Sequence, residues 1–120
     1  MGSLVNVIDF IKQDLYKNKK DCACREFFYS SMLHYSISLE IASSVDYNQP
    51  ITCEKICEII PKKFGCKSSI KTVLDNGVYA GFFIKQINQK DKRSKNYKLS
   101  EEFSIMITEW YLAGKEKFAN

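Results

Sequence analysis

Apolar residues in the first 45 positions recur every three or four residues, which is the period of a helix with a buried side. Between 4 and 17 the stripe comprises Leu4, Ile8, Ile11 and Leu15. A polar connection, KNKKDCAC, separates it from a longer pattern over 25–45 that is apolar on more than one side. Such a helix is buried within its own domain or in a dimer. The pattern therefore predicts two N-terminal helices.

Two shorter helical patterns follow a polar loop. Thr52 is a good N-cap for a helix over 53–60. A second helix, capped by Lys67 or Ser68, is expected to extend to about Ala80. Its apolar positions share one side: Ile70, Val73, Leu74 and Val78.

Two apolar runs then enclose a charged, turn-like centre. Gly81 is suited to the left-handed conformation that terminates a helix. Residues 83–88 and 97–99 predict the strands of a hairpin, with QKDKRSKN as its turn. Ser100 followed by two glutamates predicts the start of a last helix, because acidic side chains are favourable in a first turn. The expected order is α-α-α-α-β-β-α, a mainly α fold with a small β-hairpin (α+β).

Charge is concentrated around this hairpin. Residues 62–98 carry nine Lys and one Arg against two Asp, a net charge of +8, whereas the whole chain carries +4. Association with a charged partner responds to local potential rather than to total charge. A cationic hairpin that follows two short helices is the arrangement of a winged helix-turn-helix that binds DNA.

Two groups of residues are candidates for DNA contact. In a helix-turn-helix the second helix lies in the major groove, and its polar side here offers Lys67, Ser68, Ser69, Lys71, Thr72 and Asn76. The hairpin tip would place cations on phosphates or in a narrow A·T-rich minor groove, through Lys90, Lys92, Arg93, Lys95 and Lys98. Arg93 is the residue best suited to insertion. An ordinary solvated helix face has the same composition, and lysines on a hairpin also guard against edge aggregation.

The hairpin also resembles a known family. The sequence DKR at 91–93, followed by YKLSEE at 97–102, resembles the wing and the following helix start of MarR-type winged-helix regulators. GFFI at 81–84 resembles the glycine and apolar strand after the recognition helix of that family. The similarity covers about 51–110. It implies a homodimer on a pseudo-palindromic operator, and often release of DNA by a ligand or by thiol oxidation. The chain departs from the family in its short length, an extra PKKF in the turn and a single wing Arg.

The length of 120 residues is that of one domain, 1–120. We expect 1–47 and 101–120 to be helical dimerisation elements and 51–100 to form the helix-turn-helix and wing. An apolar run of the roughly 18 residues that span a membrane is absent from the sequence. The N-terminus also lacks a targeting pattern, so a cytoplasmic location without a membrane partner is expected.

Other functional classes have less support in the sequence. The single histidine, His34, lies in an apolar helix, and neither a P-loop nor a G-x-G-x-x-G is present, so an enzyme is not expected. The cysteines do not have the usual zinc spacings and no thiol is marked as activated, so we predict no cofactor or metal; they are Cys22, Cys24, Cys53, Cys57 and Cys66. Two alternatives stay open: a winged-helix module that binds an acidic protein, and a cysteine-based metal or redox sensor. A small-molecule effector also stays open.

Overall fold

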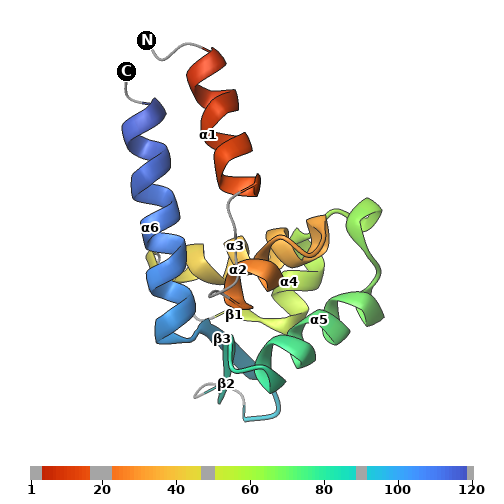
Figure 1. The fold of residues 1–120 in the computed structure, drawn as a ribbon. Coiled ribbons are helices and arrows are strands. Elements are labelled where there is room, and N and C mark those ends of the chain that lie inside the picture. The colour runs from red at the N-terminus through yellow and green to blue at the C-terminus, as the bar shows by residue number, and fades with distance from the viewer. Residues whose placement is uncertain (1–3, 17–22, 47–50, 89–91, 119–120) are drawn as a thin grey trace.

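The arrangement of helices around a small antiparallel sheet was obtained from a computed structural model, which describes residues 4–16, 23–46, 51–88 and 92–118 (Figure 1). The winged helix-turn-helix fold predicted from the sequence is confirmed. In chain order the elements are α1 (Leu4–Tyr16), α2 (Ala23–Phe28), α3 (Met32–Asp46), β1 (Ile51–Thr52), α4 (Cys53–Ile59), the 3-10 turn η1 (Lys62–Phe64), α5 (Lys67–Tyr79), β2 (Phe83–Ile87), β3 (Lys95–Leu99) and α6 (Glu101–Phe118).

The single helix predicted over 25–45 is wrong, because the chain forms α2 and α3 with a break between them. Ser30 turns its hydroxyl back to donate to the Glu26 carbonyl at 2.7 Å. Ser31 then starts α3, and its hydroxyl accepts the backbone N–H of His34 at 3.1 Å, which is an N-cap bond. Serine side chains compete with the backbone for hydrogen bonds in this way, so the Ser-Ser pair favours a break over a continuous helix.

The two helices of the helix-turn-helix motif differ in how well their starts were predicted. α4 begins as expected, since the Thr52 hydroxyl accepts the backbone N–H of Lys55 at 3.1 Å. α5 begins earlier than expected, with the extended residue Cys66 as its N-cap. Lys67 and Ser68 both lie inside the first turn of α5, so neither is the cap.

The end of α5 agrees with the prediction. Gly81 has a positive φ of 85°. Its N–H donates to the Val78 carbonyl at 3.1 Å, and the Phe82 N–H donates to the Gly77 carbonyl at 2.8 Å. These two bonds form the Schellman arrangement that satisfies the last carbonyls of a helix.

The sheet has three antiparallel strands in the order β1-β3-β2. β1 was not predicted, because its two residues, Ile51 and Thr52, have too little pattern of their own and are ordered by pairing with Tyr97 and Asn96. β2 and β3 pair from Phe83–Leu99 to Ile87–Lys95, so the return strand is longer and the turn shorter than expected.

One residue, Ser100, joins β3 to α6. Its N–H donates to the Phe82 carbonyl at 2.8 Å, and its hydroxyl accepts the Phe103 N–H at 3.2 Å. Its carbonyl accepts the Ser104 N–H at 2.9 Å. Ser100 is therefore hydrogen-bonded both to the residue before β2 and to the first turn of α6.

Three phenylalanines form the centre of the core, where α2, the sheet and the start of α6 meet. Phe28, Phe83 and Phe103 are all buried. The Phe83 and Phe103 rings stack with centroids 5.8 Å apart, and Phe28 meets Phe103 edge-on at 6.1 Å. α5 comes close to this cluster through Gly77, where a Cβ would lie 2.3 Å from a ring carbon of Phe83.

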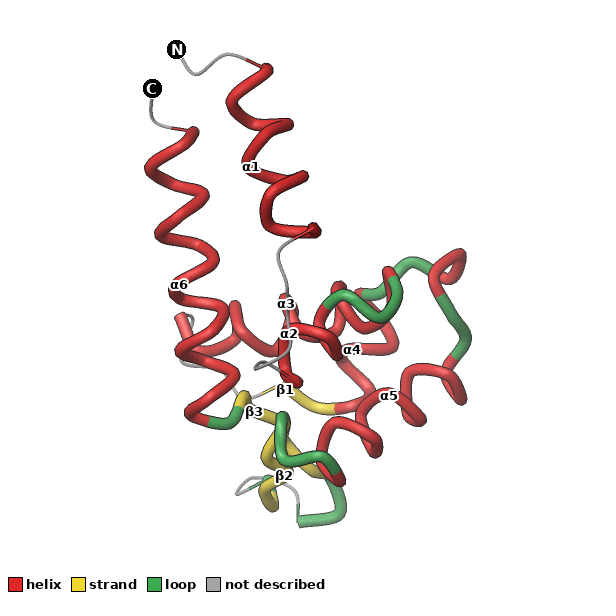
Figure 2. Tube along the Cα trace, viewed as in Figure 1, coloured by secondary structure: helices red, strands yellow, loops and turns green. Residues whose placement is uncertain are grey.

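α1 and the distal part of α6 lie side by side and project away from the rest of the molecule (Figures 1 and 2). Apolar side chains remain exposed on both helices: Leu4, Val5, Ile8 and Ile11 on α1, and Ile105, Tyr111 and Leu112 on α6. Among the described residues, the helices are too short or too polar to cross a bilayer.

Candidate nucleic-acid interface

The outer side of α5 carries the first group of predicted contacts. The inner side of this helix is buried through Ile70, Val73, Leu74 and Gly77. Of the six predicted contacts, Ser69 is half-buried, and the others are exposed: Lys67, Ser68, Lys71, Thr72 and Asn76. Asp75 is exposed on the same helix. The helix therefore presents a polar face of mixed character along its whole length.

The hydroxyl groups on this face already have partners. The Ser68 and Ser69 hydroxyls lie 3.1 Å and 3.3 Å from the Cys66 sulfur. The Thr72 hydroxyl donates to the Ser68 carbonyl at 2.9 Å. From the sequence we expected these hydroxyls to bond bases or phosphates. In the structure they bond to groups of α5 and of its N-cap residue.

Cys66 was missed as a chemically distinct residue. Hydrogen bonds from the Ser68 hydroxyl, and then from the Ser69 hydroxyl, lower the pKa of the exposed Cys66 thiol to about 6. The expectation that no thiol is activated is therefore wrong for this residue, since a thiol with such a pKa is largely thiolate at neutral pH. The signal in the sequence was a cysteine at a helix start with serines two and three positions after it.

The second group of predicted contacts lies on the hairpin of β2 and β3. Lys92, Arg93, Lys95 and Lys98 are exposed, and Lys90 falls outside the described residues. Lys95 pairs across the ladder with Ile87, and Lys98 pairs with Ile84.

The hairpin cations do not all share the tip, which corrects the sequence-based picture. Alternate residues of a strand point to opposite faces, so Lys95 and Lys98 lie on different faces of β3. Lys98 is also about 10 Å along the strand from Lys95, at roughly 3.3 Å per residue. The structure adds Lys85, an exposed cation on β2 opposite Tyr97, which belongs to the same basic stretch of sequence.

α5 and the hairpin are held together by the close approach of Gly77 to Phe83. Figure 2 shows both at the side of the molecule opposite the free ends of α1 and α6. A helix with a polar outer face and a cationic hairpin thus lie next to each other, and together they form the candidate interface.

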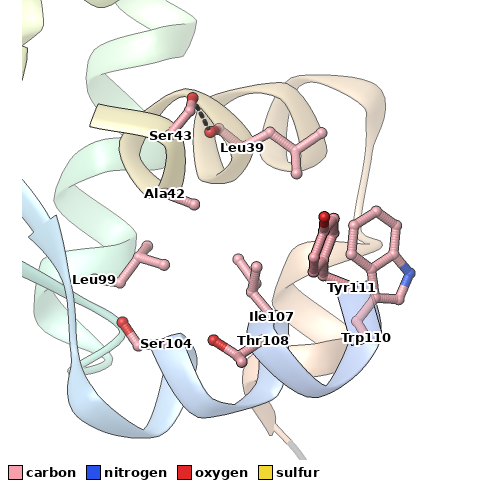
Figure 3. Close-up of a pocket in the computed structure, with 9 residues that line it drawn as sticks. All are labelled: Leu39, Ala42, Ser43, Leu99, Ser104, Ile107, Thr108, Trp110 and Tyr111. Carbon is pink, nitrogen blue, oxygen red and sulfur yellow. Dashed lines mark hydrogen bonds between the residues drawn. The ribbon is translucent and has the colours of Figure 1, made fainter. Parts of the chain in front are cut away.

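A cavity of about 420 Å³ lies between α3 and α6 (Figure 3). Its size falls within the range of small-molecule sites, and its lining is mainly apolar. The lining residues are Leu39, Ala42, Ser43, Leu99, Ser104, Ile107, Thr108, Trp110 and Tyr111. The hydroxyl of Ser43, one of these residues, donates to the Leu39 carbonyl at 2.8 Å. No site residue had been predicted here from the sequence.

The remaining cysteines offer less chemistry. Cys22 lies outside the described residues, and Cys24 is buried. Burial raises the pKa of Cys53 to about 11, and the neighbouring Cys57 thiol adds to the shift. Within the described part of the chain, three or more metal-ligating side chains do not come together anywhere. His34 packs edge-on against the Phe27 ring at 4.8 Å.

No protein-family model and no curated protein matches the chain. Its fold is similar to that of solved proteins at low sequence identity. Apo (heme-free) PefR gives a TM-score of 0.51 at 11% identity, over 92% of this chain and 98% of that one. YusO from Bacillus subtilis gives a TM-score of 0.48 at 19% identity, over 98% of this chain and 81% of YusO. A MarR protein from Peptoclostridium difficile gives a TM-score of 0.43 at 18% identity, over 97% of this chain and 66% of that protein. The similarity to PefR extends over nearly the whole chain and is a similarity of fold.

Proposed function

We propose that this chain is a MarR-type transcription regulator that binds specific sequences of double-stranded DNA as a homodimer. In this proposal α5 lies in the major groove and the β2–β3 hairpin reaches the adjacent minor groove. The protein is not an enzyme.

The observation that carries the proposal is the pairing of α5 with a cationic hairpin on one surface. The stretch 62–98, which contains both, has a net charge of +8. Lysines and arginines that neutralise phosphates supply most of the sequence-independent affinity for DNA. Lys67 and Lys71 on α5 and Arg93 on the hairpin are exposed, and we assign this role to them.

The major and minor grooves of DNA accept different protein groups, and this difference guides our assignment of contacts. A major groove admits an α-helix, whereas a narrow A·T-rich minor groove attracts an inserted arginine. We therefore assign the outer face of α5 to the major groove and Arg93 to the minor groove. Lys85 and the remaining hairpin lysines, including Lys90, serve the phosphate backbone.

The exposed apolar residues of α1 and α6 support a homodimer. Leu4 and Val5 are 73% and 63% exposed, and Tyr111 and Leu112 are more than half exposed. Large apolar patches on a helical surface mark interaction sites. In the proposed dimer, 1–47 and 101–120 supply the interface, and 51–100 supplies the DNA-binding part. Two copies would then read paired half-sites about one helical turn apart.

The cavity between α3 and α6 is the position we assign to a small-molecule effector. Leu99 at the end of β3 and Tyr111 on α6 both line it. A ligand there would contact the return strand of the hairpin and a helix of the proposed dimer interface. An apolar molecule with one or two hydrogen-bonding groups suits this lining.

The proposal is tested by fluorescence anisotropy with A·T-rich duplexes at several salt concentrations. About five neutralised phosphates give a slope of log K against log salt near −4.5. Removing two cations with Arg93→Ala and Lys95→Ala should weaken binding and make the slope shallower by about 1.8.

The matched control removes the same charge at exposed positions on α1 and α6, away from the proposed DNA contacts, with Lys12→Ala and Lys115→Ala. This control should retain the wild-type slope. Absence of binding to any duplex at about 50 mM salt, where phosphate contacts are strongest, would contradict the proposal. Loss of an acidic protein partner in Arg93→Glu would then favour the protein-interaction module.

A further inference from the structure

We propose that α5 reads a T·A and an A·T base pair, adjacent or one step further apart, through Thr72 and Asn76. The γ-methyl of Thr72 contacts the C5-methyl of thymine, and the Asn76 amide bonds the N6 and N7 positions of adenine. This inference rests on the proposed function, because it requires α5 to lie in the major groove.

The hydrogen bond of Thr72 determines what this side chain offers to DNA. Its only O–H donor is committed to the Ser68 carbonyl at 2.9 Å. The oxygen is thereby turned back along the helix, and the other group on Cβ is the methyl. Thr72 is exposed on the outer side of α5. An apolar contact with the thymine methyl is an established way for a threonine to recognise a base.

Asn76 offers DNA a polar group, whereas Thr72 offers a methyl. It is exposed on the same side of the helix, and its amide has no hydrogen-bond partner among the described residues. A free amide of this kind can donate to adenine N7 and accept from adenine N6 with a fit that no other base offers in the major groove.

The spacing of the two residues matches the spacing of bases. Residues four apart lie on one side of a helix and are separated by about 6 Å along its axis. Base pairs stack about 3.4 Å apart. Thr72 and Asn76 can therefore reach pairs that are adjacent or one step further apart.

The other polar residues of α5 are less suited to reading bases. The Ser68 and Ser69 hydroxyls are occupied by the Cys66 sulfur. Lys71 carries a flexible charge, which suits a phosphate better than a defined base edge. We therefore assign base reading on this face of α5 to the Thr72 methyl and the Asn76 amide.

The test uses duplexes altered only in the major groove. A pool of 30-base-pair duplexes with a randomised centre is enriched on the wild-type chain. The enriched pool is then amplified with thymine or with uracil, which lacks the C5-methyl, and separately with adenine or 7-deaza-adenine, which lacks N7. Minor-groove contacts of the hairpin do not involve these atoms, so they are unaffected.

We expect uracil to weaken wild-type binding by roughly fourfold for each methyl contact. Thr72→Val keeps the methyl and should keep this sensitivity, whereas Thr72→Ser keeps the hydroxyl and should lose it. 7-Deaza-adenine should weaken wild-type binding by roughly fivefold or more. Asn76→Ala should bind both adenine pools equally.

Two results would overturn the assignment while leaving DNA binding intact. The first is equal wild-type affinity for the thymine and uracil pools or for the adenine and deaza-adenine pools. The second is a uracil effect in Thr72→Ser as large as in wild type. If the chain enriches no duplex at all, the proposed function fails and the base assignment fails with it.

Discussion

Cys66 shows how two small side chains alter the chemistry of a third. Its thiol is exposed at the start of α5, and the Ser68 and Ser69 hydroxyls lower its pKa to about 6 from an ordinary value of 9.0. Because the folded pKa is lowered, the stabilisation that the thiolate gives the fold is complete above about pH 9. It is lost as the pH falls from there through about 6.

This ionisation predicts a pH profile for chemical modification. Cys66 should react with iodoacetamide with a midpoint near pH 6, since the thiolate is the nucleophile. Replacing both serines by alanine should move the midpoint up toward the ordinary value. Mass spectrometry of the modified peptides measures this, with Cys53, whose pKa is about 11, as the internal unreactive control. A midpoint above pH 8 in the wild-type chain would contradict the geometry around Cys66.

Gly77 makes a second prediction at the residue scale. Gly77→Ala should lower the free energy of unfolding by about 1–2 kcal/mol, because overpacking against Phe83 outweighs the gain in helix propensity. Denaturant unfolding measures the change. In a Phe83→Leu background the same substitution should cost less, which gives a double-mutant cycle. A Gly77→Ala chain as stable as wild type would show that the ring can move aside.

The elements differ in how far the sequence determines them. Periodicity located α1, α4, α5 and α6, and the glycine and cap signals placed the start of α4 and the end of α5. The break between α2 and α3 was missed because both helices share one apolar pattern, and the break depends on local bonds of Ser30 and Ser31. β1 was missed because it is ordered by its partner strand.

The same distinction applies to the candidate interface. Residue types and charge selected the outer face of α5 and the hairpin. They could not give the internal bonds of Ser68 and Thr72, nor the strand faces of Lys95 and Lys98, because these depend on register and on rotamers. The cavity between α3 and α6 arises from elements far apart in the chain.

The start of α3 offers a test at the scale of the element. Ser31→Ala should lower the free energy of unfolding by about 1 kcal/mol, since it removes the N-cap bond to the His34 N–H. Ser43→Ala on the same helix serves as the control. Its hydroxyl bonds only back to carbonyls within the helix, so its loss should change stability by less than about 0.5 kcal/mol. Equal effects of the two substitutions would argue against Ser31 as the helix start.

At the scale of the whole molecule, the arrangement of α1 and α6 separates the proposed dimer interface from the proposed DNA-binding surface. Ile8→Glu with Ile11→Glu should shift the chain to monomers, because both side chains are exposed on α1 and would carry charge into an apolar interface. Light scattering after size-exclusion chromatography measures the mass. Lys12→Ala on the same helix should leave the mass of a dimer. A wild-type chain that is monomeric at high micromolar concentration would refute the dimer.

Because one residue, Ser100, joins β3 to α6 and is held by three hydrogen bonds, the direction of α6 follows the orientation of the sheet. An 18-residue helix is about 27 Å long, so a tilt of about 5° at Ser100 displaces its far end by about 2 Å. In the proposed dimer α6 belongs to the interface, so this displacement would shift one subunit relative to the other. In that dimer, small rotations at the core would change the separation of the two α5 helices, which must match half-sites about 34 Å apart on DNA. The angle at Ser100 therefore limits how far the spacing of the two α5 helices can vary in the proposed dimer.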